Sequence, residues 1–111
     1  MAMIYLLWLF LQAIAPPLIT SLDSGARFLV SYPAGAEFAC TAFDMQVKPG
    51  EEPYNPRRCW FLDKDSTQYE DEWNGILPYG ADWDVYAEVG YVKPAGDGAT
   101  YYKSNVIRIH R

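Results

Sequence analysis

The sequence predicts a small all-β domain, an antiparallel β-sandwich of six to seven strands that follows a cleaved N-terminal hydrophobic signal helix. Apolar and polar residues alternate with a period of two through much of the chain, which is the pattern of strands with one buried face. Helical periodicity is absent after the apolar start of the chain. Turn residues separate the short apolar runs, as they do in β-sandwiches.

The start of the chain has the composition of a secretory signal peptide. It is apolar and uncharged and ends on the small residues Ala13 and Ala15. We expect the signal to cover residues 1–20, with cleavage between 15 and 25, and a single domain to fill residues 26–111. The alternatives are an uncleaved anchor or a buried helix. Two prolines end the apolar run short of the roughly 20 residues that an anchor needs.

Four strands are expected in the first part of the domain, and the last of them is the weakest. Their ranges are Arg27–Tyr32, Ala36–Phe43, Arg58–Leu62 and Thr67–Trp73. In the second strand the alternation puts Phe38, Cys40 and Ala42 on one face and their neighbours on the other. The loop Lys48–Arg57 contains three prolines and a glycine, which exclude regular structure and stiffen the connection. The dipeptide Asn74-Gly75 predicts a turn after the fourth strand.

The clearest strand pattern is Trp83–Tyr91. Trp83, Val85, Ala87 and Val89 point one way, whereas Asp84, Tyr86 and Glu88 point the other way. A glycine-rich loop, Pro94–Gly98, leads to a last strand within Thr100–His110, where Asn105, Ile107 and Ile109 share a face. We expect these two strands to form a hairpin.

This closing region resembles a known family. The run Ile76–Val89, followed by Lys103–Ile109, resembles the end of a fibronectin type III or related immunoglobulin-like domain over about the last third of the chain. The resemblance implies a β-sandwich whose last two strands are these. Two departures are that Trp83 stands where the family has a tyrosine, and that its strand contains no cysteine. Folds of this kind host many functions.

The two cysteines allow one intramolecular pairing, Cys40 with Cys59. We expect a structural disulfide that links neighbouring strands across the proline-rich loop and closes the two layers of the sandwich. Closing a loop of about 20 residues stabilises a domain by roughly 3 kcal/mol. A redox role is the alternative, but the chain has no Cys-x-x-Cys spacing. A persistent disulfide fits a secreted location.

The net charge is −5, from 14 acidic and 9 basic residues. This charge argues against nucleic acid or an anionic membrane as the main partner, because both favour clusters of Lys and Arg. We also expect no insertion into a membrane once the signal has been removed. We expect the acidic residues in the middle of the chain to form one solvated face, with an acidic contact patch for a basic partner as the alternative. They are Asp63, Asp65, Glu70, Asp71, Glu72, Asp82 and Asp84.

We do not expect an enzyme, a cofactor or a metal site. The single histidine, His110, lies next to the end of the chain, and two bridged cysteines leave too few ligands for zinc. Asp82 with Asp84, or Asp71 with Glu72, could act as an acid pair, but nothing in the sequence marks these carboxylates as buried. A loose calcium site on Asp63, Asp65 and Glu70 is weighed against an ordinary turn.

The chain has nine tyrosines, more than a small core needs. Exposed tyrosines among carboxylates favour protein recognition, although such rings can also cover the edges of a small core. The candidate binding surface consists of Tyr54, Arg57, Tyr79, Asp84, Tyr86 and Glu88. We therefore expect a secreted receptor- or adhesion-type module that binds an extracellular or cell-surface protein, either alone or as a piece of a longer chain. The alternative is a secreted effector or inhibitor of an extracellular hydrolase that acts through the loop Pro49–Pro56.

Overall fold

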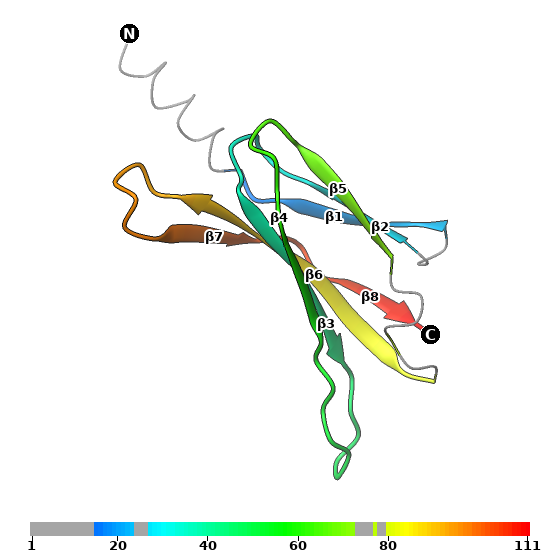
Figure 1. The fold of residues 1–111 in the computed structure, drawn as a ribbon. Helices are drawn as coiled ribbons and strands as arrows, with labels where there is room; N and C mark the ends of the chain where they lie inside the picture. Colours follow the sequence, from blue (N-terminus) through cyan, green and yellow to red (C-terminus); the bar gives the residue numbers. More distant parts are fainter. Residues whose placement is uncertain (1–14, 24–26, 73–76, 78–79) are drawn as a thin grey trace, which may run out of the picture.

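The computed structural model describes residues 15–23, 27–72, 77 and 80–111, and these residues form eight β-strands (Figure 1). In chain order the strands are β1 (Leu18–Leu22), β2 (Arg27–Ser31), β3 (Phe38–Met45), β4 (Arg57–Phe61), β5 (Gln68–Glu72), β6 (Asp82–Val92), β7 (Ala99–Lys103) and β8 (Ile107–His110). The apolar start of the expected signal, the Asn74-Gly75 turn, Trp73 and Tyr79 lie outside the described residues. No helix among the described residues is long and apolar enough to cross a membrane.

The strands form two antiparallel sheets (Figure 1), which confirms the all-β prediction. The first sheet has the order β1-β2-β5. The second has the order β4-β3-β6, and both β7 and β8 pair with the far side of β6. One half of β6 pairs with β7 and the other half with β8. The long strand β6 therefore organises most of the second sheet.

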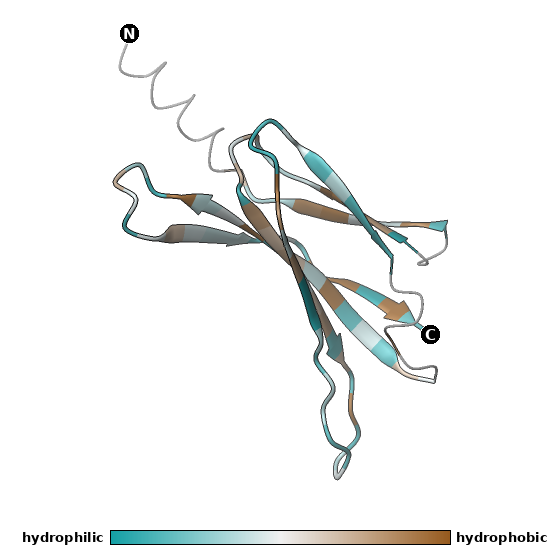
Figure 2. Cartoon of the chain, viewed as in Figure 1, coloured by the Kyte–Doolittle hydropathy of each residue, from teal (hydrophilic) through white to brown (hydrophobic). Residues whose placement is uncertain are grey.

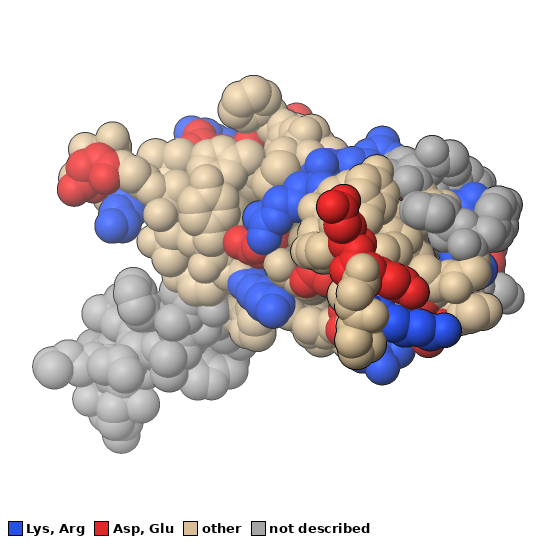
Figure 3. Space-filling view, turned by 90° about the horizontal axis from the view of Figure 1, so that it is seen from below, with Lys and Arg blue, Asp and Glu red and all other residues tan. Residues whose placement is uncertain are grey.

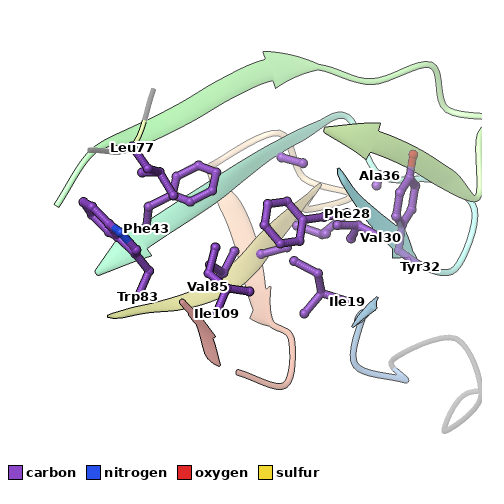
Figure 4. Packing of buried hydrophobic residues seen from close by; sticks show 13 residues of the cluster. Ile19, Phe28, Val30, Tyr32, Ala36, Phe43, Leu77, Trp83, Val85 and Ile109 are labelled. Atoms are coloured by element: carbon purple, nitrogen blue, oxygen red, sulfur yellow. The ribbon is translucent and has the colours of Figure 1, made fainter. Parts of the chain in front are cut away.

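The core lies between the two sheets. Trp83, Val85, Ala87 and Val89 of β6 are all fully buried, which confirms the alternation predicted for this strand. Phe28 of the first sheet packs against Phe43 of the second, with ring centroids 6.0 Å apart (Figure 4). Burial of each large apolar side chain stabilises the fold by about 2 kcal/mol. Figure 2 shows apolar and polar residues alternating along the strands that supply these side chains.

Strand β1 was not expected from the sequence. It pairs with β2 along its whole length, and its Ile19 is 1% exposed in the core. The sheet thus begins at Leu18, before the expected start of the domain at residue 26. Cleavage at 15–17 would keep β1 whole, whereas cleavage near residue 20 or 25 would remove part or all of it.

The faces of β3 separate as the alternation predicted, and the structure identifies which of them is the core. Ala39, Thr41 and Phe43 point between the sheets and are buried. Phe38 and Cys40 lie on the other side of the sheet, where Phe38 pairs with Phe61 and Cys40 with Cys59. Both sets contain apolar residues, so the pattern alone could not assign the inner face.

The last strand is divided in two, so the prediction of one strand within Thr100–His110 was wrong. At Ser104 the backbone N–H donates to the carbonyl of Ala87, and the Ser104 hydroxyl accepts from the Ala87 N–H. Both donor–acceptor distances are 2.8 Å. Because the side chain replaces a backbone acceptor here, regular pairing stops between β7 and β8. Asn105 follows in this break and turns toward the other sheet.

Polar contacts tie the two sheets together along both open sides of the sandwich. On one side Asn105 holds both backbone groups of Ile19 in β1: its Oδ1 accepts from the N–H at 2.9 Å, and its Nδ2 donates to the carbonyl at 3.0 Å. We call this contact the amide seam. On the other side the Arg58 guanidinium of β4 donates to the Glu72 carbonyl at 2.9 Å and lies 3.3 Å from the Asp71 carboxylate of β5. We call this contact the ionic seam.

The acidic residues do not share one solvated face, so that expectation was wrong. Asp71 is only 4% exposed, inside the ionic seam. Glu70 pairs with Arg27 on the first sheet, whereas Asp84 pairs with Arg108 on the second. These carboxylates face different ways because alternation and strand order distribute them over different surfaces.

The disulfide Cys40–Cys59 forms as predicted, and it links neighbouring strands across the proline-rich loop. Both cysteines, however, belong to the five-stranded sheet, where they lie directly opposite each other on β3 and β4. The expectation that the bridge closes the two layers was therefore wrong. It holds together the two strands at one edge of a single sheet.

Candidate binding face

The outer face of the five-stranded sheet carries most of the predicted binding residues. We define it as the side of β3, β4, β6, β7 and β8 that points away from the core. Alternation in β6 puts Asp84, Tyr86 and Glu88 on this face because their neighbours are buried. Cross-strand pairing then sets which side chains of the adjacent strands meet them.

Tyr86 lies at the centre of a cluster of charged side chains. The Arg57 guanidinium donates to the Glu88 carboxylate at 2.8 Å and to the Tyr86 hydroxyl at 3.2 Å. The Lys103 ammonium lies 4.2 Å from the centre of the Tyr86 ring, a cation–π contact. Partial burial lowers the pKa of Arg57, but the Glu88 carboxylate outweighs this effect and the pKa is raised. The tyrosine is thus held by a cation at its hydroxyl and another over its ring.

A second polar cluster lies beside the first, toward β8. The Asp84 carboxylate accepts from Arg108 through Nε at 2.9 Å and Nη2 at 3.3 Å, and from the Gln46 side chain at 2.8 Å. The hydrogen bond that Arg108 donates to the Asp84 carboxylate raises the pKa of Arg108. Next to this pair, the His110 ring is 2.6 Å from the Asp82 carboxylate. Exposed pairs of this kind contribute up to about 1 kcal/mol each, so their main effect is to orient side chains.

Four of the six predicted binding residues share this face. Arg57 contacts both Tyr86 and Glu88 directly. Asp84 lies two residues before Tyr86 on the same face of β6. Tyr54 is separate: it lies in the β3–β4 loop, and its ring packs against the core residue Trp83, with centroids 6.0 Å apart. Tyr79, the remaining candidate, lies outside the described residues.

Several other tyrosines cover the edges of the core, which was the alternative interpretation of their number. Tyr69 shares a hydrogen bond of 3.1 Å with Thr41 and packs edge-on against Trp60. Tyr91 donates to the Pro33 carbonyl at 2.7 Å. Burial raises the pKa of each phenol to about 12. These rings close gaps between strands rather than presenting a surface.

Beyond the disulfide, the outer face becomes apolar, and this region was not expected from the sequence. Phe61 is 90% exposed and Tyr101 56% exposed. The Phe38 ring lies over Gly90, where any side chain would collide with it, and its centroid is 5.3 Å from that of Tyr101. A groove of about 480 Å³ adjoins these rings and is lined by Glu37, Phe38, Phe61, Leu62, Asp63, Lys64 and Val92. This region could have been found from the sequence. Phe38 lies two residues before Cys40 and Phe61 two residues after Cys59, so strand alternation puts both rings on the same face as the disulfide.

Charges of both signs are mixed on the face of the molecule drawn in Figure 3. Figure 3 shows acidic and basic side chains beside one another rather than in separate patches. Among the residues that the structure describes, no group of three or more histidine, cysteine or acidic side chains could hold a metal ion. Glu70, one of the carboxylates weighed for calcium, instead lies 3.3 Å from Arg27.

No protein-family model, curated protein or solved structure matches the chain.

Proposed function

We propose that this protein is a secreted binding module of the fibronectin type III or immunoglobulin-like kind, which recognises an extracellular or cell-surface protein through its outer face. Three features support the proposal. The chain starts with a signal-like apolar segment, the two antiparallel sheets resemble the proposed class, and the disulfide is compatible with an oxidising compartment.

The observation that carries the binding role is the Tyr86 cluster. Tyrosine supplies a large contact area and a hydrogen-bonding hydroxyl with few rotatable bonds, which suits recognition. Arg57 and Lys103 restrict the ring, so little side-chain entropy remains to be lost when a partner binds. The cluster also rests on regular strands, which hold side chains more accurately than loops do.

The experiment is a binding screen of the purified full-length expression product against extracellular proteins and intact cells. Tyr86→Ala and Arg57→Ala should each weaken binding to the partner found, by about tenfold for an interface residue of average importance. Gln68→Ala is the matched control, because Gln68 is exposed on β5 in the other sheet. Unchanged affinity in both outer-face variants would remove the basis of the proposal. The intact mass of the secreted product would also fix the cleavage site and the disulfide.

A second candidate function is favoured by the β3–β4 loop. Every residue from 46 to 55 is exposed, and the loop projects past the end of both sheets (Figure 1). A projecting loop stiffened by prolines could insert into the active site of an extracellular hydrolase, since ordering it costs little entropy. Replacing Pro49 and Pro53 by glycine should weaken such inhibition and leave binding through Tyr86 unchanged.

A further inference from the structure

Strand β4 is an open edge of the five-stranded sheet. Leu62 N–H donates to the Glu37 carbonyl at 2.8 Å, and the Pro56 carbonyl accepts from Phe43 N–H at 3.0 Å. In an antiparallel pair the bonded residues alternate, so even-numbered residues of this strand face β3. Arg57, Cys59 and Phe61 therefore direct their backbone N–H and C=O groups outward. No other strand within the described residues pairs with that side.

Free edges of this kind are commonly protected by charge, proline or a covering loop. Here Pro56 precedes β4, and Arg57 and Arg58 occupy one end of it. The other end is not protected, because Phe61 is 90% exposed. Phe61 is part of a contiguous apolar patch around the groove, with Phe38, Leu62 and Val92, and an apolar patch beside an open edge marks an interaction surface.

We infer that β4 pairs with β4 of a second copy of this chain, antiparallel and around a two-fold axis at Cys59. The two five-stranded sheets then join into one continuous sheet. In this register Cys59 lies opposite Cys59 of the second copy, and Arg57 lies opposite its Phe61. The interaction is isologous, since each copy contributes the same five residues.

Hydrogen bonding and charge both select this register. It overlaps all five residues of β4, and it places the outward-facing residues opposite one another, so that their N–H and C=O groups can pair. Arg57 meets Phe61 on the outer face and Arg58 meets Trp60 on the inner face, giving a cation–aromatic pair on each side of the sheet. If the two-fold axis lay at Arg58 instead of Cys59, fewer residues of β4 would overlap, and Arg58 would lie opposite Arg58 of the second copy. Moving the axis to Trp60 shortens the overlap equally and separates Arg58 from Trp60.

The same register accounts for the groove. Because the two strands are antiparallel, Pro56 and Asn55 of the second copy lie opposite Leu62 and Asp63. These two residues line the groove together with Phe61. The apolar half of the outer face would then be covered at its β4 side. Tyr86, Glu88 and Lys103 lie on β6 and β7, away from the paired edge, and stay open in the dimer. Arg57 belongs both to their cluster and to the paired edge, so the backbone pairing of β4 leaves the tyrosine accessible to the proposed partner.

Sedimentation equilibrium of the purified expression product, from micromolar to millimolar concentration, tests this inference. We expect a monomer–dimer equilibrium. Phe61→Lys sets like charges opposite each other and should weaken the dimer by about tenfold or more. Phe61→Pro removes an outward N–H that the monomer does not use, so it should keep the fold and also weaken the dimer. Tyr101→Lys is the control at the opposite edge of the same face and should leave the dimer unchanged.

Each other outcome counts against the inference. A monomer at all concentrations overturns it, and so does a dimer that persists equally in both Phe61 variants. A dimer that Phe61→Lys weakens and Phe61→Pro does not would be an apolar contact without strand pairing, which also overturns it. Circular dichroism of each variant shows that the fold is retained, so that loss of the dimer is not loss of the domain. Binding of the extracellular partner is measured separately, so failure here leaves the proposed function standing.

Discussion

The two open sides of this sandwich are closed by different chemistry. In the amide seam one neutral side chain, Asn105, satisfies both backbone groups of Ile19. In the ionic seam Arg58 meets a carboxylate that is 4% exposed, and one oxygen of Asp71 has no hydrogen-bond partner among the residues that the structure describes. The amide seam is uncharged, and both backbone groups of Ile19 are hydrogen-bonded in it. The ionic seam is charged, and one of its carboxylate oxygens lacks a hydrogen bond within the described residues.

The difference matters because burial costs a charged group more than a neutral one. Burial raises the pKa of the Asp71 carboxyl, and the nearby Arg58 only partly offsets this effect. No titratable group takes part in the contact between Asn105 and Ile19. The two sides should therefore respond differently to substitution and to pH, although both join the same pair of sheets.

The largest expected effect comes from removing Arg58. Arg58→Ala leaves Asp71 buried without its cation, which should lower the free energy of unfolding by about 3 kcal/mol. The Arg58 side chain is 43% exposed, so the loss of stability should lie at the lower end of the range for buried pairs. Urea unfolding at neutral pH measures it. Arg57→Ala is the matched control, since its pair with Glu88 is exposed and should cost about 1 kcal/mol or less. Equal losses in the two variants would show that the ionic seam is not buried.

Loss of the amide seam should have the next largest effect. Asn105→Ala leaves the N–H and C=O of Ile19 without partners, at a cost of about 2 kcal/mol. Asn55→Ala provides a comparison, because the Asn55 side chain accepts a single exposed bond from Met45 N–H at 3.2 Å. Thermal unfolding of both variants measures the difference. A smaller loss in Asn105→Ala than in Asn55→Ala would mean that water replaces the amide at no cost.

The smallest expected effect is a dependence on pH that only the ionic seam should show. The pKa of Asp71 is raised on folding, so its protonated form stabilises the folded state. This contribution to the free energy of unfolding is fully present below the unfolded pKa, and it is lost as pH rises through the folded pKa. Relative to Asp71→Asn, the wild type should thus become less stable between acidic and neutral pH. Unfolding free energies of both proteins over that range test the sign. A difference that is constant or grows with pH would contradict it.

The sequence predicted those parts of the fold where the pattern of apolar and polar residues allowed only one arrangement. Along residues 83–89 of β6, apolar residues occupy every second position, and Asp84, Tyr86 and Glu88 occupy the rest, so the alternation separated the inner and outer faces directly. The expected and observed bounds of β2 to β6 agree within two residues over the described part. The disulfide followed from there being only two cysteines.

The remainder depended on contacts between distant residues. Strand β1 merges with the apolar start of the chain, so its pairing with β2 left no local signal. The break after β7 depends on Ser104 meeting Ala87 across the sheet. Asp71 lies within a run of acidic residues that looks solvated, and only the packing of β5 against β4 buries it. On the outer face, alternation placed Asp84, Tyr86 and Glu88 together, but only strand pairing could bring Arg57 to them.

The close approach of the Phe38 ring to the backbone at Gly90 has a consequence for how this chain can change by mutation. Every substitution at position 90 adds a Cβ where the Phe38 ring now lies, so it requires that ring to move off the backbone. A smaller residue at position 38 would remove this requirement, and the two positions should therefore tend to vary together among descendants of this gene. Glycine at 90 thus serves the packing of its neighbour across the sheet, rather than the turn or loop that a glycine usually signals.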